Sequence, residues 1–349
     1  MSSRIDRRRL SVICLGIVAI LIVAGCGSSS DSTDSSSASG GSLTLYSSQH
    51  EPITEALVAD FEKESGAKVE VRFGEDEGLA SQIEQEGDAS PADVFLAENT
   101  PPLELLAGKE LLAEVDSSTL EEVPSQYNSP TGHWVGVAAR ETVMVYNPDL
   151  IAANELPASI LDLAKPEWEG KLAIAPSEPD FVPIVSAIEK LDGEAAAVEW
   201  LEGFSANAKR YNDNEGIIAA VNAGQIDAGI INHYYWYEAA AEEGKDKIPS
   251  KLHYFGNEDP GALVNISGTG ALESSDDPEL AQEFLAYIVS EEGQTAMTES
   301  GDWEYPLNSA VPPPPGLKPF DSLDPPKVSP ADLGDGSAPV ELMEQVGLL

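Results

Sequence analysis

The sequence contains little cysteine and little positive charge. Only two of its 349 residues are cysteine, Cys14 and Cys26, and Cys14 lies in a leader that we expect to be removed. A single cysteine in the mature chain excludes a disulfide framework and a thiolate metal cluster. Lysine and arginine number 19 against 61 acidic residues, a formal charge of −42. Because a phosphate backbone needs a basic face, this balance excludes nucleic acid as a partner.

Motifs of several enzyme classes are also absent. The chain has no GxSxG elbow, no HExxH pair, no P-loop and no dinucleotide-binding fingerprint. This argues against hydrolytic and nucleotide-dependent enzymes. The acidic residues are spread over the whole chain, where they serve solubility and would also favour a cationic ligand.

A leader and a tether are predicted before the folded part. Residues 1–25 hold four arginines and then the apolar run SVICLGIVAILIVA, which is short for a membrane span and typical of a secretory signal. The following VAGC resembles the lipobox of bacterial lipoproteins, which implies that Cys26 is lipidated. An ordinary signal peptide or a single anchor helix is the alternative. Residues 26–42, rich in serine and glycine, are predicted to form a flexible tether.

From residue 43 onward, strand patterns alternate with helix patterns. LTLYSS, KVEVRF and ADVFLA are predicted strands, and helices are predicted at 53–66 and 77–87 between them. This order predicts parallel strands with crossover helices, and a similar alternation continues to the C-terminus. Residues 134–147 read as one long strand or as two strands around a break. The sequence therefore predicts an α/β protein, and its length favours two lobes.

Polar side chains follow three of the predicted strands. His50, Glu98 and the pair Tyr234–Tyr235 each stand where ligands bind in open α/β sheets, at the carboxyl end of a strand. Adjacent tyrosines can face one site only in a helical turn, for which Asn232 is the predicted N-cap. Imidazole, carboxylate and phenol are donors without sulfur, and only a strongly charged Lewis acid takes two phenolates at neutral pH. Ferric iron is the metal that this set predicts.

Two other interpretations stay open on the residues alone. Tyr234, Tyr235 and Trp236 could form an aromatic box for an organic cation such as a polyamine or thiamine. His50 and Glu98 could instead be the base and its orienting group in an enzyme at the cell surface. The His50–Glu98 pair distinguishes an iron site from an aromatic box, because iron needs both groups and the box needs neither.

The same residues carry a resemblance to a known family. The chain is similar to the ferric-iron-binding proteins of bacterial ABC importers, which belong to the periplasmic binding proteins with the type II, transferrin-like fold. The stretches that carry the resemblance are LTLYSSQH, ADVFLAENT, VMVYNPDL, PEWEGKLAIAPS, INHYYWYEAA, DPGALVNISGTGAL and EYPL. It implies iron ligands at His50, Glu98, Tyr234 and Tyr235.

The resemblance also implies an organisation and a role. Each of two lobes would be a mixed sheet flanked by helices, and crossover strands would form the hinge. We predict an N-lobe of residues 43–139 plus about 265–315, and a C-lobe of about 140–264 plus 316–349. The expected protein is not an enzyme; it is a monomer anchored by lipid on the outer face of the cell membrane, and it delivers ferric iron to an ABC permease.

One loop departs from the family pattern. Asn214 and Asn232 match asparagines that back the phosphate-type anion in relatives, but the anion loop itself aligns with Glu178-Pro179-Asp180. Two acids and a proline repel an anion and remove an amide donor, which leaves the synergistic anion uncertain. We hypothesise that Glu178 or Asp180 replaces the anion, directly or through a water. The alternatives are that both acids face solvent, or that Arg140 holds a carbonate.

Overall fold

The structure, a computed structural model, describes residues 40–349. The predicted leader, Cys26 and residues 26–39 of the predicted tether lie outside the described residues. Among the residues that are described, no helix has both the length and the apolar character needed to cross a membrane.

A mixed sheet runs through the described chain in the order β2-β1-β3-β9-β4-β7-β5-β6, with β8 and β10 paired to β4 beside this path. The pairs β1–β2, β1–β3, β5–β6 and β5–β7 are parallel, and every pair that involves β4 or β9 is antiparallel. The strands are β1 (Ser42–Ser47), β2 (Lys68–Phe73), β3 (Val94–Ala97), β4 (Val135–Tyr146), β5 (Leu172–Ile174), β6 (Ala208–Arg210), β7 (Ala228–Asn232), β8 (Lys251–His253), β9 (Val264–Ala271) and β10 (Tyr305–Pro306).

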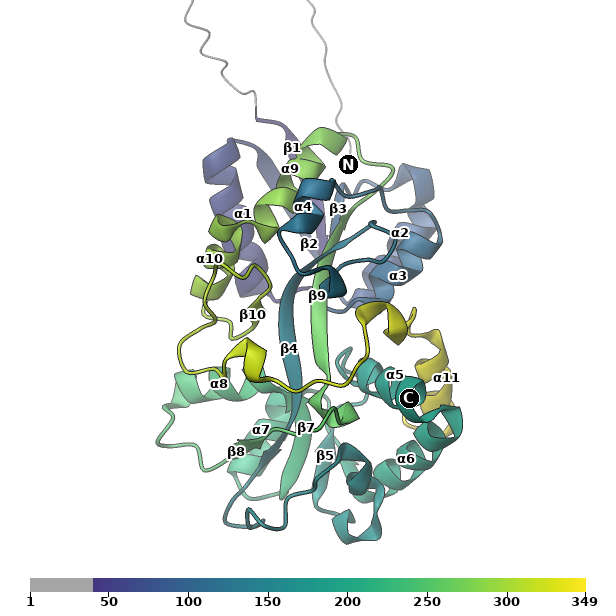
Figure 1. The fold of residues 1–349 in the computed structure, drawn as a ribbon, viewed down its shortest axis with the longest axis vertical. Coiled ribbons are helices and arrows are strands. Elements are labelled where there is room, and N and C mark those ends of the chain that lie inside the picture. Colours follow the sequence, from purple (N-terminus) through teal and green to yellow (C-terminus); the bar gives the residue numbers. More distant parts are fainter. Residues whose placement is uncertain (1–39) are drawn as a thin grey trace, which may run out of the picture. The chain divides into compact units, whose positions relative to one another are not determined.

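The helices flank this sheet in two groups (Figure 1). Those beside β1, β2, β3, β9 and β10 are α1 (Glu51–Ser65), α2 (Asp76–Glu86), α3 (Pro101–Gly108), α4 (Ser117–Glu121), α9 (Pro278–Val289) and α10 (Glu291–Glu299), and with these strands they form the N-lobe. Those beside β5, β6, β7 and β8 are α5 (Phe181–Asp192), α6 (Glu194–Asn207), α7 (Asn214–Asn222), α8 (His233–Glu243) and α11 (Ser337–Gln345), and with these strands they form the C-lobe.

Local signals in the sequence explain where the first helix begins and ends. Pro52 lies at the start of α1, where its missing N–H costs nothing. Gly66 ends the helix with a φ of 73°, a left-handed conformation that glycine adopts without a steric penalty, and its N–H bonds to the Glu62 carbonyl. The side chain of His50, at the N-cap position, makes no capping bond and is free for another role.

Strand β4 passes from one lobe to the other. Its residues from Val135 to Glu141 pair with β9, and those from Thr142 to Tyr146 pair with β7. Residues 134–147, which the sequence left as one strand or two, therefore contain a single strand with a register shift between Gly136 and Ala138. The change of partner after Glu141 marks the crossover between the two lobes, visible where β4 and β9 run side by side in Figure 1.

Each lobe has its own apolar core. In the N-lobe, buried residues of β1, α1 and α9, such as Leu45, Leu57 and Phe284, pack together. In the C-lobe, Phe181, Trp200 and Phe204 stack on one another beneath the sheet. Burial of apolar area thus stabilises each lobe separately. The polar groups at the strand ends line the space between the two lobes.

The C-terminal segment returns across both lobes. Phe320 packs against Tyr127 and Tyr305 on the N-lobe side, with ring centroids 5.8 and 5.2 Å away. Lys318 lies over the Tyr254 ring of the C-lobe, 3.9 Å from its centroid. Helix α11 then packs against α5 and α6.

Candidate metal centre

The four predicted ligands lie at strand ends, as the sequence predicts. His50 is the N-cap residue of α1, and Glu98 directly follows β3. Tyr234 and Tyr235 occupy the first turn of α8, directly after β7. Asn232 is the N-cap residue of that helix, as predicted, and its side chain makes no capping hydrogen bond.

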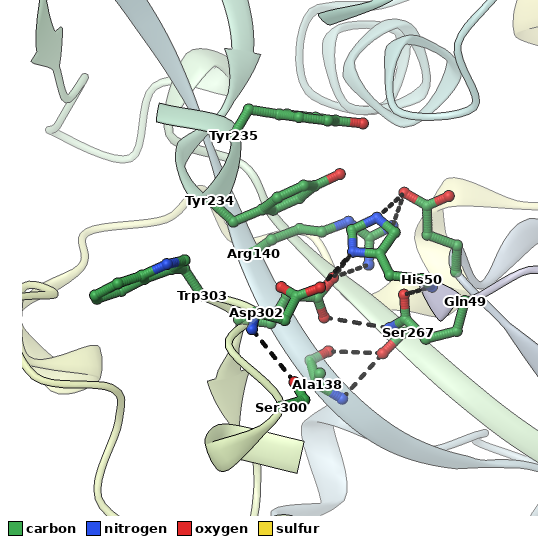
Figure 2. A network of polar contacts seen from close by, with 12 residues as sticks. Gln49, His50, Ala138, Arg140, Tyr234, Tyr235, Ser267, Ser300, Asp302 and Trp303 are labelled. Carbon is green, nitrogen blue, oxygen red and sulfur yellow. Dashed lines mark hydrogen bonds and ion pairs between the residues drawn. The ribbon is translucent and has the colours of Figure 1, made fainter. Parts of the chain in front are cut away.

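These four side chains converge in one cleft between the lobes. His50 Nε2 lies 3.6 Å from Glu98 Oε1, and the His50 ring meets the Tyr234 ring edge-on with centroids 4.8 Å apart. Figure 2 shows both tyrosine hydroxyls pointing toward His50. The two tyrosine rings lie against each other, with centroids 4.1 Å apart and planes 35° apart. Rings in mutual contact leave no gap for an organic cation between them, so this geometry does not fit an aromatic box.

The cleft is lined by carboxylates. It has a volume of about 550 Å³ and is bordered by all four predicted ligands. Among the described residues no lysine or arginine borders it, and its other acidic neighbours are Glu51, Glu75, Glu178, Glu215, Glu238, Glu242 and Asp302. Such a vestibule favours entry of a cation and disfavours an anion.

Asp180 offers a fifth donor group at this point, its fourth oxygen donor. Both tyrosine hydroxyls donate to its Oδ2, from 3.3 Å for Tyr234 and 3.4 Å for Tyr235. Arg140 Nε donates to its Oδ1 over 3.4 Å. Glu178, by contrast, is only half-buried and makes no hydrogen bond through its side chain among the described residues. Of the two acids in the loop that differs from the family pattern, Asp180 is the one that faces the tyrosines.

Arg140 is fully buried on β4 beneath this cluster. Its Nη2 donates to Asn99 Oδ1 over 2.6 Å and lies 3.8 Å from Glu98 Oε1, while Nη1 is 4.0 Å from Glu304 Oε1. Burial alone would lower the pKa of Arg140, but the carboxylates of Glu304, Asp180 and Glu98 raise it. A permanent positive charge therefore lies behind the acidic groups.

Two acidic residues near His50 were missed from the sequence. Asp302 Oδ2 bonds to His50 Nδ1 over 2.7 Å, and Glu304 Oε1 is 4.0 Å from the same nitrogen. Figure 2 shows Asp302 beneath the imidazole. A carboxylate on one ring nitrogen fixes the orientation of a histidine whose other nitrogen binds a metal. His50 and Asp302 are 252 residues apart, so no local pattern marks the pair.

A buried carboxylate also positions Glu98. Asp76 accepts hydrogen bonds from the backbone N–H of Glu98 (3.1 Å), from the backbone N–H of Asn99 (3.0 Å) and from the Asn99 side chain (3.1 Å). Ser48 donates to the same carboxylate. Burial, reinforced by the nearby Glu98, raises the pKa of Asp76 to about 7. The turn after β3 is thereby held in one conformation.

The predicted ligands differ in protonation. Burial, and then the charge of Asp180, raises the pKa of Tyr234 and Tyr235 well above the usual value. Burial disfavours charged His50, but its bonds to Asp302 and Glu98 outweigh this and raise its pKa well above 6.5. For Glu98, burial is outweighed by His50 and Arg140, which lower its pKa. Without a metal, the tyrosines are neutral and the His50–Glu98 pair is charged.

The two predicted asparagines border the same cluster. Asn214 is the first residue of α7, and Asn232 ends β7; both are buried. Nδ2 of Asn214 and both side-chain polar atoms of Asn232 have no hydrogen-bond partner within the described chain. With Glu178 and Asp180 they line a small cavity. Buried polar atoms without partners are costly, which is consistent with a site that receives a ligand or water.

Comparisons with known proteins agree with this geometry. The family model of the bacterial extracellular solute-binding proteins matches residues 89–325. The chain is 42% identical to the Fe(3+)-binding periplasmic protein of Serratia marcescens over 98% of this chain and 100% of that protein. It is 37% identical to the major ferric iron-binding protein of Neisseria meningitidis over 88% of this chain and 93% of that protein.

A solved structure has the same fold. The iron-bound HitA protein of Pseudomonas aeruginosa superposes with a TM-score of 0.85 at 43% identity, over 88% of this chain and 99% of that one. The expected two-lobed type II fold of periplasmic binding proteins is therefore confirmed. The matched family consists of solute-binding proteins, which disfavours the cell-surface enzyme.

Proposed function

Because the chain belongs to the family of bacterial extracellular solute-binding proteins, we propose that it captures ferric iron between its two lobes and delivers it to the permease of an ABC importer. The observation that carries the proposal is the convergence of His50, Glu98, Tyr234 and Tyr235 in one buried cleft. The ferric-iron-binding relatives from Serratia and Neisseria support the same solute.

The tyrosine pair makes the site selective for a strong Lewis acid. Both phenols are neutral in the metal-free protein because burial raises their pKa. A metal must therefore displace two phenol protons, which a trivalent cation does far better than magnesium or calcium. Glu98 and the two phenolates supply three negative charges, which match those of ferric iron, and neutral His50 adds a nitrogen donor.

We propose further that Asp180 takes the place of a synergistic anion. Its carboxylate already meets both tyrosine hydroxyls, at the point where a metal bound to the two phenolates would need a further oxygen. It adds a fourth negative charge, and buried Arg140 balances that charge. Arg140 donates to Asn99 and Asp180, which favours this role over one in holding a carbonate. Glu178 would then act at the entrance and not as a ligand.

We propose that the protein is a monomer, lipidated on Cys26 and held on the outer face of the cell membrane, and that its lobes have the limits predicted from the sequence. The VAGC pattern supports the anchor. A Cys26→Ala protein should lose incorporation of radioactive palmitate and should leave the membrane fraction; labelling that persists would refute the anchor.

A spectroscopic experiment tests the function directly. The purified protein is stripped of metal and mixed with ferric iron that a slight excess of a weak chelator keeps in solution. It should then develop the visible charge-transfer band of ferric tyrosinate. Tyr235→Phe should weaken the band, whereas Tyr237→Phe should leave it unchanged, because the Tyr237 hydroxyl bonds to the Gly316 carbonyl away from the site. A wild-type protein that stays colourless and releases all iron on desalting would overturn the proposal.

A further inference from the structure

His233 lies directly before the tyrosine pair and bridges the two lobes. The backbone N–H of Glu141 donates to its Nδ1 over 3.1 Å, and its Nε2 is 2.9 Å from the Trp303 carbonyl oxygen. Because Nδ1 accepts a hydrogen bond, the ring proton is on Nε2, which donates to Trp303. Both nitrogens are therefore engaged.

Glu141 and Trp303, the two hydrogen-bond partners of His233, lie at the crossover strand and beside Asp302. Glu141 is the last residue of β4 that pairs with β9 before the strand joins the C-lobe sheet. Trp303 follows Asp302, whose carboxylate holds the His50 imidazole. Figure 2 shows Asp302 directed toward His50 and the Trp303 ring directed away from it. The carbonyl that His233 binds thus belongs to the segment that orients the N-lobe histidine.

Packing leaves the His233 ring little freedom. It is fully buried and lies against the Tyr305 ring of β10, with centroids 4.9 Å apart and planes at 31°. The rings of Tyr234 and Tyr237 contact it edge-on, each with a centroid 6.2 Å away. A C-lobe side chain is therefore enclosed by groups of both lobes beside the crossover, where rotation of one lobe on the other displaces atoms least.

We propose that His233 is a positioning residue for iron binding, which ties the tyrosine turn of α8 to the segment carrying Asp302. The connection runs from His50 through Asp302 and the Trp303 carbonyl to His233 and Tyr234. It sets the separation between the N-lobe imidazole and the C-lobe phenols, and metal sites tolerate little change in such a separation. This inference rests on the proposed function, since it concerns the geometry of the same site.

Three substitutions separate the two hydrogen bonds. The amide nitrogen of a glutamine at position 233 reaches the Nε2 position and can donate to Trp303, whereas an asparagine oxygen reaches the Nδ1 position and can accept from Glu141. His233→Leu removes both bonds. His253→Leu is the matched control, because His253 Nε2 also lies 2.9 Å from a backbone carbonyl, that of Pro157, away from the cleft.

Ferric affinity by chelator competition, the charge-transfer band and the thermal midpoint of the metal-free protein are measured for all four variants. We expect His233→Leu and His233→Asn to lose about 10- to 100-fold in affinity with a shifted band, as for other groups that orient metal ligands. His233→Gln should bind about tenfold more tightly than His233→Asn, because glutamine keeps the bond to the Trp303 carbonyl, in the segment that carries Asp302, whereas asparagine keeps only the bond from Glu141. His253→Leu should keep the wild-type band and affinity.

The inference is overturned if every His233 variant keeps the wild-type affinity and band, if glutamine and asparagine behave alike, or if His253→Leu loses as much as His233→Leu. Should His233→Leu fail to fold, the glutamine–asparagine comparison decides. A wild-type protein that binds no iron refutes the proposed function itself. Iron binding by the wild type together with unaffected variants refutes only the role of His233.

Discussion

His50 and Glu98, on the N-lobe, differ from Tyr234 and Tyr235, on the C-lobe, in where their protons are before any metal binds. The N-lobe pair is already charged, because Asp302 and Glu98 raise the pKa of His50 while His50 and Arg140 lower that of Glu98. The C-lobe pair is neutral, because burial raises the pKa of both phenols. The two halves of the cleft therefore contribute to metal binding in different ways.

The difference suggests a division of labour. In the N-lobe half, protonated His50 forms an ion pair with Glu98. A metal cation can bind both side chains once it has displaced the single proton from His50. The C-lobe half yields its full charge only to a metal strong enough to deprotonate two phenols. Selectivity for ferric iron should thus come mainly from the tyrosines, and orientation mainly from the N-lobe groups.

The largest effects are expected when one ligand is removed from each half of the cleft. Tyr234→Phe should weaken ferric binding by more than about 100-fold, because even orienting groups around a metal cost 10- to 100-fold. It should also shift or remove the visible band. His50→Gln should bind less tightly than the wild type and yet keep the tyrosinate band. Absorbance titration against a chelator measures both, and a His50→Gln protein without colour would contradict the division.

Asp180, which lies between the two halves, is the next residue to substitute. Wild-type protein should load with iron in a buffer free of phosphate, carbonate and citrate, since Asp180 supplies the carboxylate. Asp180→Asn should lose about 10- to 100-fold in affinity under these conditions and should recover part of it on addition of phosphate. The matched variant Glu178→Gln should load without an added anion. A wild-type protein that needs an anion to load would contradict the role of Asp180.

The protonation difference between the two halves predicts how many protons iron binding releases. At neutral pH the metal-free site carries protons on both phenols and on His50, whose pKa values are all raised, and none on Glu98, whose pKa is lowered. Binding should release about three protons per iron, so affinity should fall as the pH falls. A pH-stat in weakly buffered solution measures this number. His50→Gln should release about two, and an unchanged value would refute the charged state of His50.

The smallest expected effect is that of Asp302→Asn. Loss of this carboxylate should lower the pKa of His50 toward its ordinary value, because the bond to Asp302 helps to raise it. Iron affinity should fall by about tenfold, at the lower end for groups that orient a metal ligand. Histidine resonances in a proton NMR titration report the pKa. The exposed Asp246→Asn serves as the control, and a His50 pKa that does not move would contradict the contact.

Much of the site was predictable because its ligands follow strands. The alternation of strand and helix patterns places His50, Glu98 and Tyr234 at the carboxyl ends of β1, β3 and β7, and adjacent tyrosines share a site only in a helical turn. The strand ends and the helical turn can be predicted because each depends on the periodicity of residues that are close together in the sequence. Ligand chemistry then narrows the candidates to a hard, highly charged cation.

Local sequence patterns are therefore sufficient to predict the α/β class, the strand ends and the donor atoms of the proposed ligands. The distant groups that complete the site come together through the tertiary fold. Asp302 reaches His50 across 252 residues because the chain returns from α10 to pair with β4. Likewise, Glu178 and Asp180 are equivalent in the sequence, but only Asp180, at the start of α5, faces the tyrosines. Such contacts depend on how the two lobes pack around β4, and no local periodicity encodes that packing.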